Sequence, residues 1–257
     1  MTFYKYHGTG NDFILIDNRE GLVSLTREQI AALCHRRYSI GADGLMLLGH
    51  AEGYDFGMIY YNADGGESTM CGNGGRCMVA FALKLDIITD HARFVAIDGE
   101  HTAAITTDGI VNLHMVDVAG MDIRNGHTIL NTGSPHYVAW VKDVAAIDVY
   151  NTGREIRNYP QFAPGGINVN FAQINGDTLT VRTYERGVED ETMSCGTGVT
   201  AVAIAATCSL TGTFATAVQT PGGELTVSFT KDTEHTAKDV ILSGPAVFVY
   251  KGETDAL

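Results

Sequence analysis

The sequence has little positive charge. It carries 17 Lys and Arg against 30 Asp and Glu, a formal net charge of −13. Nucleic-acid binding proteins usually present a basic face, and membrane surfaces attract basic segments, so both kinds of partner are disfavoured. No apolar run approaches the ~20 residues that a spanning helix needs. The N-terminal residues also lack the apolar core of a signal peptide, so we expect no membrane partner and no nucleic-acid partner.

Cysteine is scarce and unpatterned. There are five cysteines, none forms a CxxC pair, and the nine histidines are scattered. A chain of 257 residues can bury a core without disulfides. We therefore expect a reducing cytoplasm and no structural zinc site. The cysteines are Cys34, Cys71, Cys77, Cys195 and Cys208.

Glycine, by contrast, is abundant, with 30 residues. Gly and Asx turns separate short β-type runs, and Asp108-Gly109 between two such runs predicts a hairpin. The predicted strands are Phe13–Asp17, Phe56–Tyr61, Phe94–Ile97, Val111–Met115, Tyr137–Val141, Ile167–Ile174, Leu179–Tyr184, Leu225–Phe229 and Val247–Tyr250.

Three helices are predicted. Thr26–Arg37 begins with a Thr cap and a Gln three residues later, which is a capping box. The other two run from Cys71 to about Leu85 and from Cys195 to about Leu210. Both are apolar nearly all round, which is typical of a buried helix. Each half is therefore expected to wrap strands around one central helix that starts at a cysteine.

The chain contains an internal repeat. Residues 67–74 read Glu-Ser-Thr-Met-Cys-Gly-Asn-Gly, and residues 191–198 read Glu-Thr-Met-Ser-Cys-Gly-Thr-Gly. Similar offsets relate Gly10–Phe13 to Gly133–His136 and Phe56–Asn62 to Thr180–Arg186. A chance match of glycine-rich turns of this length is disfavoured, so we interpret the repeat as a duplication.

The predicted fold class is α+β, with two pseudo-symmetric lobes, each a sheet or barrel around a central helix. The N-terminal lobe is expected to span residues 1–116 and to be completed by the last strand, 246–257. The C-terminal lobe is expected to span 117–245.

The repeated motif suggests a chemistry. First-turn N–H groups of a helix bind anions such as a carboxylate, glycine clears their approach, and the helix dipole favours thiolate over thiol. If two such motifs face each other, amides of Gly72-Asn73 and Gly196-Thr197 could hold a carboxylate with its α-carbon between Cys71 and Cys195. One thiolate would remove the α-proton and the other thiol would protonate the opposite face, with no metal or cofactor.

Other interpretations compete with this one. A buried cysteine is usually a small apolar residue, which suits Cys34, Cys77 and Cys208 but leaves the glycines and the duplication unexplained. A thiol oxidoreductase is a second possibility, although such enzymes usually carry CxxC. An epimerase or racemase for proline-like or other amino acids is a third.

Several short motifs are spread over nearly the whole chain: residues 7–13 (His-Gly-Thr-Gly-Asn-Asp-Phe), 41–44 (Gly-Ala-Asp-Gly), 61–65 (Tyr-Asn-Ala-Asp-Gly), 70–74 (Met-Cys-Gly-Asn-Gly), 133–136 (Gly-Ser-Pro-His), 167–171 (Ile-Asn-Val-Asn-Phe), 184–187 (Tyr-Glu-Arg-Gly) and 194–198 (Ser-Cys-Gly-Thr-Gly). In these motifs the chain resembles the diaminopimelate epimerase family. Proline racemases share the two-thiol logic but have Cys-Gly-His-Gly in the first half, where this chain has Asn73.

The resemblance implies a cofactor-independent epimerase that acts on diaminopimelate, in lysine and cell-wall precursor synthesis. It implies a homodimer, and Cys71 and Cys195 as the acid–base pair. It further implies that His136 and Glu185 tune the thiols and that Glu185 is also a candidate for substrate contact. The remaining substrate-binding residues that it implies are Asn11, Asn62, Gly72, Asn73, Asn168, Arg186, Gly196 and Thr197.

Arg186 suits the distal carboxylate of a substrate with an amino-acid group at each end, because a guanidinium binds carboxylate bidentately. The competing interpretations are an Asx turn for a single Asn and a core histidine for His136. The chain departs from the family at Ser134, where Asn is common, and at Gly44, where some members have Gln. Its loop 187–194 is also one residue longer than usual.

Overall fold

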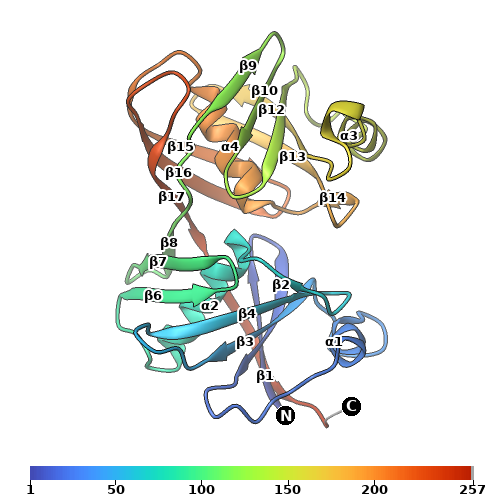
Figure 1. Cartoon of the computed structure of the whole chain (residues 1–257), viewed down its shortest axis with the longest axis vertical. Coiled ribbons are helices and arrows are strands. Elements are labelled where there is room, and N and C mark those ends of the chain that lie inside the picture. The colour runs from blue at the N-terminus through green and yellow to red at the C-terminus, as the bar shows by residue number, and fades with distance from the viewer. Residues whose placement is uncertain (256–257) are drawn as a thin grey trace. The chain divides into compact units, whose positions relative to one another are not determined.

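The computed structural model describes residues 1–255. It divides into two compact units (Figure 1). Unit 1 comprises Met1–Leu113 together with the residues from Gly244 onward, and unit 2 comprises His114–Ser243. The last strand of the chain thus belongs to the unit that contains the first.

Unit 1 is a mixed sheet with two helices. Its strand order is β18-β1-β2-β3-β4-β6-β7-β8, in which β2–β3 and β4–β6 are parallel and the other neighbours antiparallel. The elements are β1 (Thr2–Gly8), β2 (Asn11–Asp17), α1 (Arg27–Cys34), β3 (Gly44–Gly49), β4 (Phe56–Asn62), β5 (Glu67–Ser68), α2 (Gly72–Lys84), β6 (His91–Ala96), β7 (Gly99–Ile105), β8 (Ile110–His114) and β18 (Val247–Glu253).

Unit 2 has the order β9-β10-β11-β12-β13-β15-β16-β17, with β11–β12 and β13–β15 parallel and the other neighbours antiparallel. The elements are β9 (Met121–Arg124), β10 (His127–Asn131), β11 (Pro135–Trp140), α3 (Val149–Arg157), η1 (Pro160–Phe162), β12 (Asn168–Asn175), β13 (Thr178–Glu185), β14 (Asp190–Thr192), α4 (Gly196–Ala206), β15 (Gly212–Thr220), β16 (Gly223–Lys231) and β17 (Lys238–Pro245).

The two units repeat one topology. β1 to β8 correspond in order and in pairing sense to β10 to β17, and β18 corresponds to β9. In each unit the first helix joins the second and third strands of the repeat, and the second helix follows the short strand β5 or β14. The predicted α+β fold with two pseudo-symmetric units, each built around a helix, is therefore confirmed.

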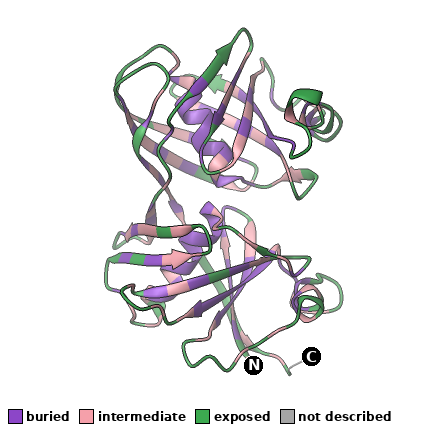
Figure 2. Ribbon diagram, viewed as in Figure 1, coloured by how far each residue is buried: buried purple, intermediate pink, exposed green. Residues whose placement is uncertain are grey.

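Both central helices lie in the hydrophobic core. Val199–Ala205 of α4 are buried and pack with Val138, Val181, Val218 and Val227 from the surrounding strands. In α2, the segment from Gly72 to Val79 is fully buried. Figure 2 shows α4 largely in the colour of buried residues. The apolar character of α4, and of α2 apart from Arg76 and Lys84, follows from this position.

Helix ends depart from the sequence in two places. The capping box of Thr26 and Gln29 forms as predicted, but α1 ends at Cys34 rather than Arg37. α4 ends at Ala206 rather than Leu210. There the Thr207 hydroxyl donates to the Ile204 carbonyl at 2.7 Å, and Cys208 turns to a φ of 31°, which a helix cannot continue.

The nine predicted strands and the Asp108-Gly109 hairpin are all present, most with slightly different ends. The main helix missed by the sequence is α3. Its sequence is polar, and only Val149, Gly153 and Ile156 are buried. Gly153 packs directly against the side chain of Tyr184, a contact that leaves no room for a Cβ. This helix is stabilised by packing on β12 and β13 rather than by an apolar pattern of its own.

Candidate active site

Each repeated cysteine begins a central helix. Cys71 is the N-cap of α2 with φ −98° and ψ 132°, and Cys195 is the N-cap of α4 with φ −114° and ψ 110°. Their carbonyls accept the first helical bonds, from Gly75 at 2.7 Å and Val199 at 2.8 Å. The predicted position of both thiols at helix N-termini is therefore confirmed. Each thiol lies where the helix dipole favours negative charge.

Two of the other thiols, Cys34 and Cys77, suit no acid–base role. Burial raises the pKa of Cys34 to about 11 and that of Cys77 to about 12. Both remain protonated near neutral pH, in agreement with their interpretation as core residues.

In unit 1, a chain of amides leads to the Cys71 thiol. Asn11 donates from Nδ2 to Asp43 at 2.7 Å, and because a carboxylate only accepts, the Asn11 carbonyl oxygen must face the other way. That oxygen accepts from Asn73 Nδ2 at 3.3 Å and lies 3.8 Å from Cys71 Sγ. Asn11, Cys71 and Asn73, assigned to the site from sequence, are thus brought together.

Two cations hold the carboxylates behind Asn11. Arg36 binds Asp12 with both terminal nitrogens, at 3.0 and 2.6 Å, and also reaches Asp43 at 2.6 Å. Lys5 pairs with Asp12 at 2.7 Å. Despite partial burial, which opposes it, hydrogen bonds from Arg36 and Lys5 lower the pKa of Asp12 to about 2. Asp12 is therefore ionised at neutral pH, and the Asn11–Asp12 segment is anchored by ion pairs.

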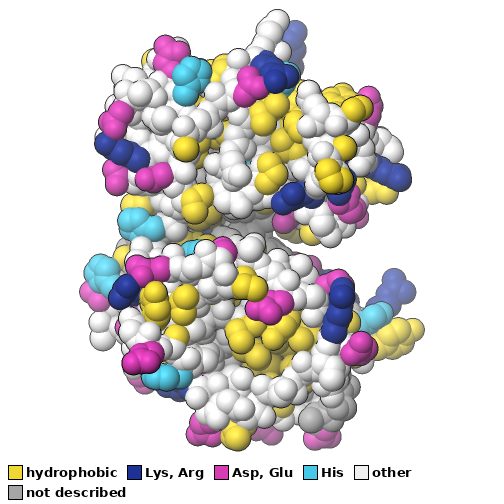
Figure 3. Space-filling view, viewed as in Figure 1, with side chains coloured by type: hydrophobic (Ala, Val, Ile, Leu, Met, Phe, Trp, Pro, Cys, Tyr) yellow, Lys and Arg dark blue, Asp and Glu magenta, His cyan; other side chains and the backbone are white. Residues whose placement is uncertain are grey.

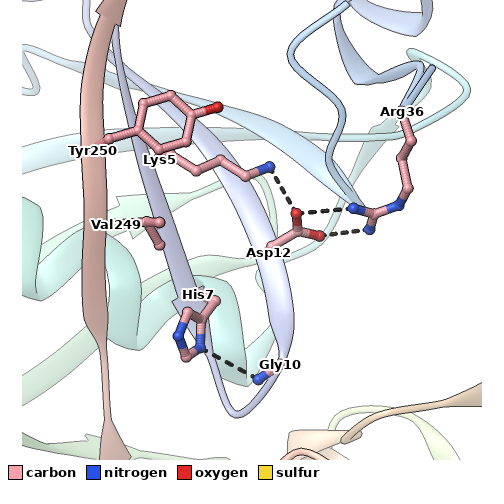
Figure 4. A pocket seen from close by; sticks show the side chains of 7 residues that line it. All are labelled: Lys5, His7, Gly10, Asp12, Arg36, Val249 and Tyr250. Carbon is pink, nitrogen blue, oxygen red and sulfur yellow. Dashed lines mark hydrogen bonds and ion pairs between the residues drawn. The ribbon is translucent and has the colours of Figure 1, made fainter.

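The same ion pairs line a cavity of about 320 Å³ in unit 1 (Figure 4). Lys5 and Arg36 both point at Asp12 there, so their charges are already matched. The cavity lining includes neither cysteine of the repeat. This cavity is therefore separate from the cysteine of the repeated motif.

Asn62 is exposed at the end of β4, opposite Gly44 in the register. No hydrogen bond within the described chain joins its side chain to Asn11, Asn73 or Cys71. Asn62 is therefore not part of the hydrogen-bonded cluster around Cys71. A side chain at Gly44 would collide with Tyr60 and with the Tyr61 carbonyl. A side chain at position 44 would therefore require Tyr60 to move.

In unit 2, a second cluster surrounds Arg186. Asn168 is 3% exposed and donates to Ser134 Oγ at 2.8 Å and to the Pro135 carbonyl at 3.2 Å. Its oxygen accepts from the Arg186 amide at 2.8 Å. Arg186 Nη2 in turn donates to Ser134 Oγ at 3.3 Å. Asn168 therefore fixes the backbone at Arg186, and Ser134 lies beside the guanidinium.

The second thiol has polar neighbours of its own. Cys195 is 6% exposed, and its Sγ lies 3.4 Å from the hydroxyl of Thr197. Thr132 donates to the Thr197 carbonyl at 2.8 Å. Glu185 accepts from the Thr192 hydroxyl at 3.0 Å, across the pair of β13 and β14. The loop 187–194 contains the short strand β14, whose Thr192 supports Glu185.

His136 is fully buried and neutral. Burial, with a smaller effect of the Arg186 charge, lowers its pKa from 6.5 to about 3. Asn170 donates to the Tyr137 carbonyl at 3.1 Å, so the Asn170 atom 3.1 Å from His136 Nδ1 is also its amide nitrogen. Nδ1 therefore accepts, and Nε2 carries the proton. That Nε2 has no hydrogen-bond partner within residues 1–255.

The last glycine of each motif has a packing role. A Cβ on Gly74 would overlap the end of Met46, and a Cβ on Gly198 would overlap the amide oxygen of Asn170. Close packing therefore requires glycine at both positions. They let each helix approach its sheet closely.

The sequence missed three residues that the structure adds to these clusters: Asp43, Asn170 and Arg76. Asp43 lay within a recognised motif but had no assigned role. Asn170 likewise lay within a recognised motif, residues 167–171, but had no assigned role. Arg76 could have been found, because it is the one charge in an otherwise apolar helix until Lys84.

The surface agrees with the composition. Figure 3 shows acidic and basic side chains interspersed over both units on the face drawn.

Within residues 1–255, no group of three or more His, Cys, Asp or Glu side chains is arranged to hold a metal ion. None of the helices described is long and apolar enough to cross a membrane.

Comparison with known proteins gives a consistent result. The family model for diaminopimelate epimerase matches residues 3–118 and 128–249. A diaminopimelate epimerase of Flavobacterium psychrophilum is 47% identical over 254 residues, which cover 98% of this chain and 99% of the relative. One from Chlorobaculum tepidum is 44% identical, covering 95% of this chain and 98% of the relative.

Solved structures share the fold at low identity. A PhzF-family phenazine biosynthesis protein of Bacillus anthracis matches with a TM-score of 0.75 and 15% identity, over 99% of this chain and 98% of that one. A hydroxyproline epimerase of Agrobacterium vitis matches with a TM-score of 0.71 and 15% identity, over 98% and 91%.

Proposed function

Because the chain belongs to the diaminopimelate epimerase family, whose members are isomerases, we propose that it interconverts LL- and meso-diaminopimelate by two-thiol proton transfer at one α-carbon. The observation that carries the mechanism is the duplicated cysteine, which begins a buried helix in each unit. A single reactive thiol would not require both copies, whereas inversion at carbon requires a base on one face and an acid on the other.

In the proposed step, the thiolate of one cysteine takes the α-proton and the thiol of the other gives its proton to the opposite face. The carboxylate carries the charge of the intermediate, and the first-turn amides of Gly72-Asn73 and Gly196-Thr197 stabilise it. The protons balance, since one thiol is gained for each thiol lost. The reverse reaction uses the same groups with exchanged roles.

We assign the distal end of the substrate to Arg186 and its neighbours. A guanidinium binds a carboxylate bidentately. That of Arg186 donates to Ser134, while Asn168 holds the Arg186 backbone. Asn11, Asn62 and Glu185 offer oxygen atoms for ammonium groups. The neutral His136 can influence a thiolate only by donating a hydrogen bond from Nε2, not by charge.

The wider setting belongs to the same proposal. We infer a role in lysine and peptidoglycan precursor synthesis, a cytoplasmic location that suits five free cysteines, and a homodimer. The lobes would be residues 1–116, completed by 246–257, and residues 117–245.

Replacing either thiol tests the mechanism. Cys71→Ser and Cys195→Ser should each lower turnover of LL-diaminopimelate by at least about 100-fold, because a serine hydroxyl is a far weaker acid and base. Cys208→Ser is the control and should retain activity, since Cys208 lies beyond the end of α4. Deuterium incorporation from deuterated water, followed by mass spectrometry, reports proton exchange at the α-carbon.

Two outcomes would contradict the proposal. Turnover of LL-diaminopimelate that survives in both cysteine variants would remove the acid–base assignment, whereas a wild-type protein without such turnover would favour a redox or binding role. Epimerisation of proline or of amino acids with one carboxylate, at rates equal to that of diaminopimelate, would remove the substrate assignment.

A further inference from the structure

Arg76 is a buried cation with no carboxylate partner. Its side chain is 0% exposed in α2. Its guanidinium donates to the Gly72 carbonyl at 3.3 Å, Asn73 Oδ1 at 3.0 Å, Thr9 Oγ1 at 3.2 Å and the Pro245 carbonyl at 3.5 Å. All four acceptors are neutral, and no ion pair involving Arg76 occurs within residues 1–255. Arginine stays protonated in proteins, so its full charge persists in this dry site.

The second copy of the motif has no such charge. Arg76 lies five residues after Cys71, and the residue five after Cys195 is Thr200. Each side chain donates to the carbonyl of the first helical residue, Arg76 to Gly72 at 3.3 Å and Thr200 to Gly196 at 2.9 Å. The two side chains thus occupy equivalent places, and they differ in charge.

The charge of Arg76 acts on the Cys71 thiol. Burial lowers the pKa of Arg76, whereas Coulombic interactions with the thiolate forms of Cys77 and Cys71 raise it, and each interaction is mutual. Arg76 therefore favours the thiolate of Cys71. Cys77 does not become the thiolate in place of Cys71, because burial raises its pKa and keeps it protonated. The arginine also orients Asn73, whose amide nitrogen bonds Asn11 beside the thiol.

The other charged and polar groups near the start of α2 do not reverse this preference for the thiolate form of Cys71. Asp12 and Asp43 are paired with Lys5 and Arg36, and Asp98 accepts from the Met70 amide at 3.2 Å. The carbonyl oxygen of Asn11 favours the thiol, but it lies 3.8 Å from Sγ and is neutral. A buried full charge outweighs a long neutral contact.

In unit 2, the ionisable side chains that the sequence assigns to the site are His136, Glu185 and Arg186, besides Cys195 itself. His136 is neutral because of its burial. Glu185 is acidic and opposes a thiolate. Arg186 is only partly buried and hydrogen-bonded to Ser134 and Gly165, so solvent screens it more than Arg76.

We propose that Arg76 is a positioning residue that sets the resting protonation of the pair, with Cys71 as the thiolate and Cys195 as the thiol. This inference rests on the proposed two-thiol mechanism. The free enzyme is then ready for the isomer whose α-proton faces Cys71. Each turnover moves that proton to Cys71 and the Cys195 proton to carbon, so proton exchange with water must restore the resting state.

Site-resolved alkylation tests this assignment. The substrate-free enzyme is treated with iodoacetamide between pH 5 and 10, and mass spectrometry follows Cys71 and Cys195 separately. The pH midpoint reports thiol ionisation independently of access. The midpoint of Cys71 should lie at least about one unit below that of Cys195. Equal midpoints, or a lower one at Cys195, would overturn the proposal without touching the two-thiol mechanism, which turnover tests separately.

Charge variants separate electrostatics from packing. Arg76→Gln keeps hydrogen-bond donors but removes the charge and should raise the Cys71 midpoint by about one unit or more, whereas Arg76→Lys should restore most of the shift. Thr200→Val is the matched control in unit 2 and should leave the Cys71 midpoint unchanged. A Cys71 midpoint that is the same in folded Arg76→Gln and wild type would mean that Arg76 is only structural. If Arg76→Gln does not fold, the wild-type midpoints alone decide the resting assignment.

Discussion

At the scale of single residues, amide side chains near the thiols are oriented by groups that accept or donate but cannot do both. The Asp43 carboxylate turns the carbonyl of Asn11 toward Cys71, and the Arg76 guanidinium turns the amide nitrogen of Asn73 toward Asn11. In unit 2, the Arg186 backbone amide does the same for Asn168. Because these partners hold each amide side chain in one orientation, the site loses less conformational entropy when a substrate binds.

Asp43→Ala should therefore weaken catalysis although Asp43 is outside the thiol pair. Losing a charge-assisted hydrogen bond frees Asn11 to turn its amide, and kcat/KM should fall by about tenfold. Steady-state kinetics with LL-diaminopimelate measures the effect. Asp17→Ala, which removes only a surface pair with Arg19, is the control and should behave as wild type. Equal kinetics in both variants would refute a role for Asp43.

His136 predicts a pH dependence of stability. Its pKa is about 3 in the folded chain and near 6.5 when unfolded, so the unfolded chain binds the extra proton first as the pH falls. Stability is then full above about pH 6.5 and is lost below it, by about 1.4 kcal/mol per pH unit from His136 alone. Urea unfolding at pH 7, 6 and 5 measures this slope. His136→Gln should flatten it, and an unchanged slope would assign the effect to another group.

At the scale of elements, the central helices approach their sheets through a glycine three residues after the cysteine. The two contacts differ in kind. Gly74 meets the flexible end of Met46, whereas Gly198 meets Asn170, which is held by hydrogen bonds to His136, Tyr137 and Thr183. The loss of stability that a side chain at either position would cause is therefore decided by the rigidity of the neighbouring residue and not by the sequence motif.

Gly198→Ala should consequently destabilise the protein by about 1–3 kcal/mol, because the new methyl group must displace a fixed amide. Gly74→Ala should cost less, since Met46 can move and alanine favours the helix. Thermal unfolding of the two variants compares them directly. A larger loss for Gly74→Ala would contradict this account.

At the scale of the whole molecule, β18 completes unit 1 from the far end of the chain, while its counterpart β9 directly precedes β10. This strand exposes four consecutive apolar or aromatic residues: Val247, Phe248, Val249 and Tyr250, at 39–50%. Contiguous exposed apolar side chains are typical of an association surface. They support the proposed homodimer.

Light scattering after gel filtration should give twice the 27.6 kDa of one chain. Val249→Asp should shift the protein toward the mass of a single chain, because a charge would be buried in the interface. Ile174→Asp is the control, since Ile174 is 61% exposed at the end of β12 in the other unit. A single-chain mass for the wild type would contradict the dimer.

The sequence by itself determined the duplication, the fold class, the buried helices and the positions of both thiols at helix starts. These follow from local patterns: repeated motifs, apolar periodicity and capping residues. Only the tertiary structure decided that Asp43 and Arg76 orient the amides beside Cys71, that His136 is neutral, and that α3 is a helix. These features depend on burial and on partners distant in the chain, such as Thr9 or Asn170, and no local pattern encodes the free energy of such contacts.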